Sequence, residues 1–155
     1  MSRTDRAGRV IAAPSAAVYR ALLDRGALEA WLPPDGMRGR VGRWDPRPGR
    51  GFRMVLTHLD PAGSPGRTSG ATDVVDVGFA DLVPSERVVQ RVVFEADDPS
   101  YAGVMTLARR LAAAGDGTEV TVTATDVPPG IDRAVHEAAI ASSPANLASY
   151  IETAG

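Results

Sequence analysis

The stretch Asp132-Arg-Ala-Val-His-Glu-Ala-Ala-Ile-Ala-Ser-Ser-Pro-Ala-Asn-Leu-Ala-Ser-Tyr-Ile-Glu152 decides the fold that this sequence predicts. Alanine and isoleucine recur through it, and Val135, Leu147 and Ile151 extend them into an apolar stripe. At about 1.5 Å per residue, a helix of this length measures roughly 30 Å, which is enough to cross a sheet. We therefore expect one long C-terminal helix that buries its stripe.

Proline interrupts this predicted helix at position 144. A proline inside a helix has no N–H for the carbonyl of Ile140, and its ring clashes there, at a cost of about 3 kcal/mol. Ser143 suits an N-cap, with Pro144 as the first residue of a new helix. We therefore predict a kink or a restart near Ser142–Ser143.

The chain before this helix consists mostly of strand-like segments separated by turns. In 51–59, Phe52, Met54, Leu56 and His58 alternate with their neighbours, and we assign these four to the interior because they are bulkier and less charged. A tight turn at 115–117 and Gly/Pro-rich loops at 45–51 and 60–70 separate strands, and the second loop is expected to be mobile. The predicted strands are 9–13, 37–41, 51–59, 72–82, 87–94, 103–112 and 118–125.

Two short helices are predicted directly after the first strand. Pro14 is tolerated at a helix start, and Val18, Ala21 and Leu22 fall on one face of the helix that follows. We expect Gly26 to end it, and one further helical turn, 27–31, to stop before the prolines at 33 and 34.

This order of elements favours an α+β fold. Strands linked by hairpins, with helices at the two ends of the sequence, predict a curved antiparallel sheet of about six to seven strands wrapped round the long C-terminal helix. The gap between sheet and helix is the natural place for a cavity. No internal repeat or second domain is predicted, so residues 1–155 are expected to form a single domain.

Composition excludes several classes of function. The net charge is −2 and the basic residues are scattered, which argues against nucleic-acid binding. All 17 basic residues are arginine, so no lysine can form a Schiff base, and the absence of cysteine excludes disulfides and thiolate chemistry. The first residues lack the apolar run of a signal peptide, and no stretch of about 18 apolar residues predicts a membrane span. We expect a cytoplasmic protein.

Segments spread along nearly the whole chain form an ordered set. They are 10–14, 18–22 with Trp31, 45–49, 82–88, 94–99, 102–105, 117–118, 127–131, 136–137 and 146–148. Together they resemble the family of activator of heat-shock-protein-90 ATPase homologues (AHSA-like). The resemblance implies the helix-grip fold of the larger START-like (SRPBCC) superfamily and a hydrophobic cavity. It implies no single activity, because members bind lipids, hormones or polyketides and a few are enzymes.

Arg109 departs from this family pattern. It stands on the same side of its strand as Met105, Leu107 and Leu111, where relatives carry an aromatic or apolar residue. If that side faces the cavity, the guanidinium can hold a ligand carboxylate. The alternative is that the strand has reached the edge of the sheet and Arg109 extends to water.

The two histidines, His58 and His136, are the remaining candidates for chemistry. His58 is aimed inward, either as an anchor or general base in the cavity or as a strand-end histidine bonded to a backbone carbonyl. His136-Glu137 begins like a zinc-protease helix, but Ile140 replaces the second ligand, so we expect no metal and place His136 at the cavity rim or the surface. Asp97 and Asp98 form a carboxylate pair before Pro99, but adjacent strand residues point to opposite faces and Asp-Pro favours a turn, so we interpret this segment as a loop.

The leading hypothesis is a protein that binds a small hydrophobic molecule, without a catalytic residue or cofactor and with loops 45–51 and 60–70 gating access. One alternative is a protein-interaction module similar to the chaperone co-factor, and another is an enzyme of the cyclase or hydrolase type. A homodimer is left open. The residues expected to line the cavity are Trp31, Phe52, Met54, His58, Phe79, Tyr101, Met105, Arg109, His136 and Ile140.

Overall fold

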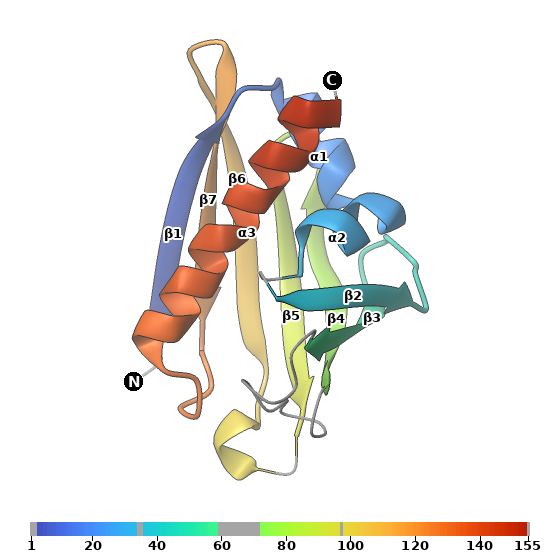
Figure 1. Ribbon diagram of the computed structural model, residues 1–155, viewed down its shortest axis with the longest axis vertical. Helices are drawn as coiled ribbons and strands as arrows, with labels where there is room; N and C mark the ends of the chain where they lie inside the picture. The colour runs from blue at the N-terminus through green and yellow to red at the C-terminus, as the bar shows by residue number, and fades with distance from the viewer. Residues whose placement is uncertain (1–2, 34–35, 59–71, 97, 155) are drawn as a thin grey trace.

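The computed structural model describes residues 3–33, 36–58, 72–96 and 98–154. They form seven strands, three α-helices and one 3₁₀ turn, which Figure 1 shows as a curved sheet with the helices on one side. The elements are β1 (Thr4–Ile11), α1 (Ser15–Leu22), α2 (Arg25–Trp31), β2 (Met37–Gly42), β3 (Gly51–His58), β4 (Thr72–Val83), β5 (Arg87–Glu95), η1 (Pro99–Tyr101), β6 (Met105–Ala114), β7 (Gly117–Thr125) and α3 (Arg133–Ala154).

The sheet is antiparallel throughout, with the strand order β1-β7-β6-β5-β4-β3-β2. Strands β2 to β7 follow one another as neighbours, whereas β1 pairs with the last strand, β7. The chain must therefore travel from one edge of the sheet to the other between β1 and β2. Helices α1 and α2 make this connection, and they lie on the same side of the sheet as α3 (Figure 1).

The first helix forms as its apolar spacing predicts. Val18, Ala21 and Leu22 are buried, and Pro14 stands just before the first residue of α1. The prediction that Gly26 ends this helix is wrong. The helix stops at Leu22, and Asp24 begins α2 because its side chain accepts a hydrogen bond from the backbone N–H of Ala27 at 2.8 Å.

The first strand begins earlier than predicted, at Thr4 instead of Arg9. Its early residues, 4–9, are polar, charged or small, which gives little apolar signal. The strand forms because it extends the sheet along β7, with Asp5 opposite Ala124 and Ile11 opposite Thr118. Cross-strand pairing, not local hydrophobicity, therefore fixes its length.

Helix α3 packs on β1 and β7 and touches both shorter helices. Its buried side includes Ile140, Leu147 and Ala148, but Val135, predicted to belong to the stripe, is 63% exposed. The predicted restart at Ser143 is wrong, because α3 runs through Pro144 as one helix, and the kink stays a prediction. Burial of apolar side chains on both sides of Pro144 keeps the two halves together.

The other strands and turns agree with the predicted ranges within a few residues. The turn before β7 has Gly115 at a φ of +59°, a conformation that favours glycine. Asp98 caps η1 by accepting the N–H of Ser100, in agreement with its assignment to a turn. The loop predicted at 60–70 lies outside the described residues.

Candidate functional site

The inner face of the sheet carries a continuous row of apolar side chains across four strands. Phe52 lies opposite Val77, Val77 opposite Val92, and Val92 opposite Met105. All four are buried. The alternation predicted for β3 is thus confirmed at Phe52 and Met54, while Leu56 and His58 at its end are half-buried.

An aromatic cluster covers one end of this row. The rings of Phe52 and Phe79 lie 5.7 Å apart, and the ring of Trp44, from the segment after β2, lies 5.4 Å from Phe52 and 6.1 Å from Phe79. These centroid distances are typical of favourable aromatic pairs. Phe52 and Phe79 are therefore engaged in core packing, whatever else they contact.

A charged side chain lies on the same inner face. Arg109 stands between Val88 on β5 and Val122 on β7, and it is only 5% exposed. The alternative that it reaches water at the edge of the sheet is wrong, because β6 has a neighbouring strand on each side. Its guanidinium is turned into the protein.

Two neutral groups contact the Arg109 guanidinium. Its Nη1 donates a hydrogen bond of 2.8 Å to Oε1 of Gln90, which is also buried. Its Cζ lies 5.4 Å from the centre of the Trp31 ring, a cation–π distance. The Trp31 ring is fixed in turn, because its Nε1 donates to the carbonyl of Ala21 at 3.0 Å. No ion pair to Arg109 occurs among residues 3–33, 36–58, 72–96 and 98–154.

Burial changes the acidity of this guanidinium. Desolvation lowers the pKa of Arg109 from 12.5 to about 10. That value is still well above neutral pH, so the side chain keeps its charge. The inner face therefore presents a permanent cation within an apolar surface.

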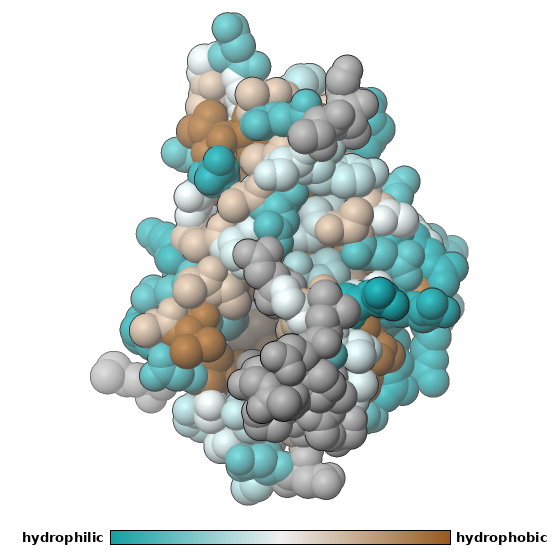
Figure 2. Space-filling view, in the orientation of Figure 1, coloured by the Kyte–Doolittle hydropathy of each residue, from teal (hydrophilic) through white to brown (hydrophobic). Residues whose placement is uncertain are grey.

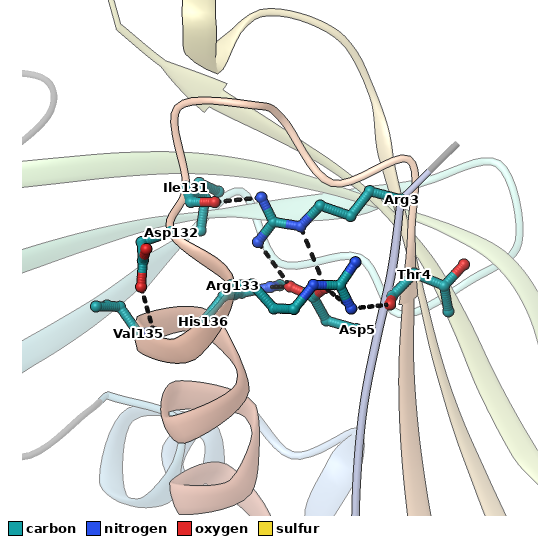
Figure 3. A network of polar contacts seen from close by, with 8 residues as sticks. All are labelled: Arg3, Thr4, Asp5, Ile131, Asp132, Arg133, Val135 and His136. Atoms are coloured by element: carbon teal, nitrogen blue, oxygen red, sulfur yellow. Dashed lines mark hydrogen bonds and ion pairs between the residues drawn. The ribbon is translucent and has the colours of Figure 1, made fainter. Parts of the chain in front are cut away.

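A second buried charge lies where β1 meets the first turns of α3. Asp5 is fully buried, and Figure 3 shows that Arg3, Arg133 and His136 reach it. Arg3 donates from Nε and Nη2 at 3.2 and 2.9 Å, and His136 Nδ1 lies 2.8 Å from the carboxylate. Arg133 Nη1 is 3.4 Å away and also donates to the carbonyl of Thr4.

These contacts stabilise the charged form of Asp5. The hydrogen bond from Arg3 is the main cause that lowers its pKa, and burial, which raises it, is outweighed. The prediction that His136 lies at the cavity rim or on the surface is wrong, because this side chain is buried and contacts Asp5. This group of residues fastens the first strand to the last helix, and we call Asp5, Arg3, Arg133 and His136 the Asp5 cluster.

Two buried polar atoms have no hydrogen-bond partner in the part of the chain that the structure describes. One is the hydroxyl of Ser143, on the buried side of α3 with Ile140 and Leu147. The other is Nε2 of His58, which lies 3.7 Å from the Asp73 carboxylate, beyond hydrogen-bond distance. Such atoms are rare in native interiors and call for an explanation.

The structure thus brings Trp31 and Arg109 into contact, joins Phe52 to Phe79, and puts Met105 in the same row as Phe52. The other predicted lining residues are more dispersed. Tyr101 is half-buried in η1, and His136 belongs to the Asp5 cluster. Their common lining of one cavity stays a prediction.

Sequence reasoning missed Gln90, Ser143 as an inward polar group, and Asp5. The alternation of Val88, Gln90 and Val92 was a usable signal, because it places a polar side chain on an apolar face. No comparable local signal marked Asp5.

Two grooves among the described residues lie on the outer side of the sheet. The larger, of about 650 Å³, runs between the 43–51 segment and strands β4 and β5, with Arg91, Val93 and Val104 among its walls. The smaller, of about 490 Å³, lies along β2 and β3 beside Arg38 and Arg40. The cavity between the sheet and α3, and the gating role of loop 45–51, stay predictions.

The opposite side of the molecule, seen in Figure 2, carries hydrophobic residues beside the first turns of α3, where Val135 is exposed. Over β2 this face is mainly hydrophilic. No helix in the described ranges is both long and apolar enough to cross a membrane.

Comparison with known proteins gives one family and one fold. The sequence model of the family described as activator of Hsp90 ATPase homolog 1-like protein matches residues 12–152. A crystal structure of a Chromobacterium violaceum protein is 30% identical, with a TM-score of 0.83 over 96% of each chain. No protein with a curated description matches the sequence.

More distant structures share the fold. A Rhodobacter sphaeroides protein is 17% identical, with a TM-score of 0.77 and all of both chains covered. A Nitrosomonas europaea protein is 23% identical, with a TM-score of 0.71 over 97% of this chain and 94% of that one. The helix-grip arrangement predicted from the sequence is thereby confirmed.

Proposed function

Because this chain belongs to the family of activator of Hsp90 ATPase homolog 1-like proteins, we propose that it binds a small, largely apolar molecule between the inner face of the sheet and α3. It acts as a binding protein and not as an enzyme. The expected ligand site is an apolar surface with a few polar anchors, the usual composition of small-molecule sites.

The observation that carries this proposal is the unpartnered hydroxyl of Ser143 on the buried side of α3. Leaving such a group without a hydrogen bond costs about 1–3 kcal/mol, which natural sequences rarely accept. A serine that neither caps the helix nor bonds within it gives the fold no advantage over alanine. A bound molecule that hydrogen-bonds the hydroxyl accounts for its presence.

The apolar row from Phe52 to Met105 supplies the complementary wall. It faces the helices, and its side chains carry no polar atoms that would bind water in competition with an apolar ligand. Burying apolar ligand surface against it contributes about 25 cal/mol per Å². Affinity would come from this wall, and orientation from the polar anchors.

A thermal-shift screen of small metabolites and lipids tests the proposal. A ligand at 100 times its Kd adds about 2.7 kcal/mol to the free energy of unfolding, which a melting curve resolves. Ser143→Leu, which fills the inner side of α3, should abolish the shift, whereas Ala141→Leu on the exposed side should preserve it. The melting curves of the two ligand-free variants show that both fold.

Two results would contradict binding at this place. One is a screen in which no compound raises the Tm, together with a native mass spectrum of purified protein that contains the chain alone. The other is a ligand shift that survives Ser143→Leu in full.

A second candidate function, docking of a partner protein such as a chaperone, is favoured by the larger outer groove. Its walls include the exposed residues Val93 and Val104, and exposed apolar side chains beside a groove are typical of interaction sites. Pull-down of the chaperone and its ATPase rate would test this function. Val93→Asp should abolish the effect, whereas Val10→Asp, an exposed valine on β1, should not.

A further inference from the structure

The charge of Arg109 has no counterion in the part of the chain that the structure describes. Its neighbours along the sheet are Val88 and Val122, and its own strand places Leu107 and Leu111 on the same side. Its guanidinium contacts the Gln90 amide through a hydrogen bond and the Trp31 ring through a cation–π interaction, and both groups are neutral. Among the described residues, nothing therefore neutralises the positive charge at this position.

Keeping that charge buried is costly. Transfer of an ion from water to a protein interior costs several kcal/mol even after relaxation, and one neutral hydrogen bond and one cation–π contact recover only part of it. Methionine or leucine would fill the same place without this cost. A charge retained here is explained by an interaction that is made only when a ligand is bound.

The guanidinium is also held in one orientation. Nη1 is fixed by Gln90, and Cζ lies 5.4 Å from the centre of the Trp31 ring, which is itself anchored to the backbone of α1. Nε and Nη2 make no hydrogen bond among the described residues. These two nitrogens form one edge of the planar fork, which matches the two oxygens of a carboxylate.

We propose that Arg109 is the anion-binding group of this interior, and that the ligand is an apolar molecule bearing one carboxylate, held at the Nε–Nη2 edge. The proposal rests on the proposed function and specifies its ligand class. A carboxylate carries the single negative charge that neutralises one guanidinium. A phosphate ester, with a charge near −2, would leave a buried negative charge in its place.

The test compares acids with neutral analogues of the same carbon skeleton. Decanoic acid is paired with decanamide, and 2-naphthoic acid with 2-naphthamide, and Kd values are measured by calorimetry. The protein should bind each acid at least tenfold more tightly than its amide. Acid binding should weaken at least tenfold in Arg109→Met, while amide binding stays within twofold.

Arg110→Met is the matched control, because Arg110 is the next residue on β6 and points to the exposed face. It removes the same charge and should leave both Kd values unchanged. A melting curve of Arg109→Met without ligand verifies that the variant folds.

The outcomes separate the two proposals. If acid and amide bind the unmodified protein equally, or if Arg109→Met binds the acids normally, the carboxylate assignment is overturned while the binding function stands. If neither acids nor amides bind and the wider metabolite screen is also negative, both proposals fall. If Arg110→Met weakened acid binding as much as Arg109→Met does, the effect would come from the overall charge of the protein, and the assignment would likewise be overturned.

Discussion

Among the buried ionisable side chains that the structure describes, Asp5 and Arg109 have opposite surroundings. Asp5 is fully buried, and three basic side chains reach its carboxylate from the N-terminal segment and the first turns of α3. Arg109 is buried nearly as deeply, and in the described part of the chain its guanidinium meets one amide and one aromatic ring, with no acidic group. Among the residues that the structure describes, the Asp5 carboxylate has basic partners and the Arg109 guanidinium has no acidic one.

We interpret this difference as one of role: Asp5 stabilises the fold, whereas Arg109 is kept for ligand binding. A buried ion with all its hydrogen bonds made joins distant parts of the chain, and Asp5 joins β1 to α3 across more than a hundred residues. A buried ion without a counterion weakens the ligand-free fold. We therefore expect substitutions at the two positions to change the free energy of unfolding with opposite signs.

Asp5→Asn should have the largest effect. Removing one partner of a buried ion pair costs about 3–5 kcal/mol, and we expect about 3 because Arg133 is 55% exposed and can turn to water. The measurement is urea denaturation at neutral pH. A loss below about 1 kcal/mol would show that the Asp5 cluster does not hold β1 to α3. The structural role of Asp5 would then be contradicted.

The double substitution Arg109→Met, Gln90→Leu should stabilise the ligand-free protein by about 2 kcal/mol. Replacing buried ionic groups with apolar ones of similar volume is often neutral or stabilising by about 1–4 kcal/mol. Arg109→Met alone should gain less, because it leaves the Gln90 amide unpaired at a cost of about 1–3 kcal/mol. A double variant that melts well below the unmodified protein would identify Arg109 as a structural residue.

The sequence was sufficient to predict most of the fold, because the strands and α3 follow local rules of alternation and helix length. Prediction failed where distant contacts decide the outcome. Helix α3 continues through Pro144 because Ile140 and Leu147 are buried on either side, and β1 starts at Thr4 because β7 offers backbone partners. Neither fact is encoded within a few residues.

The candidate site shows the same division. Arg109 was identified from its place among apolar neighbours, but the sequence left its orientation open, and only its burial shows that it points inward. Gln90 carried the same local signal and was missed. Asp5 lies 131 positions from His136 in the sequence, so only the folded chain shows that the two side chains contact each other.

The acid limb of the stability curve should also report on the Asp5 cluster. The folded-state pKa of Asp5 is below its ordinary value of 3.8, so the unfolded chain takes up the proton first as pH falls. The stabilisation from Asp5 is present above pH 3.8 and is lost as pH drops through the lower folded pKa. Denaturation from pH 6 to pH 2 should show this decline, and Asp5→Asn should flatten it. A variant curve parallel to that of the unmodified protein would contradict the assignment.

The smallest expected effect is that of Arg133→Gln, which sharpens the comparison inside the Asp5 cluster. Arg133 is half-exposed, its ion pair to Asp5 is 3.4 Å long, and surface pairs contribute about 0–1 kcal/mol. Arg3, which donates two shorter bonds to Asp5, should contribute more, because its guanidinium is far less exposed. We therefore expect Arg133→Gln to lose less than 1 kcal/mol and Arg3→Gln to lose more, both measured by urea denaturation. The reverse order would mean that the cluster is held mainly by the Arg133 contact to Thr4, so that the charge of Asp5 would matter less than backbone tethering of β1.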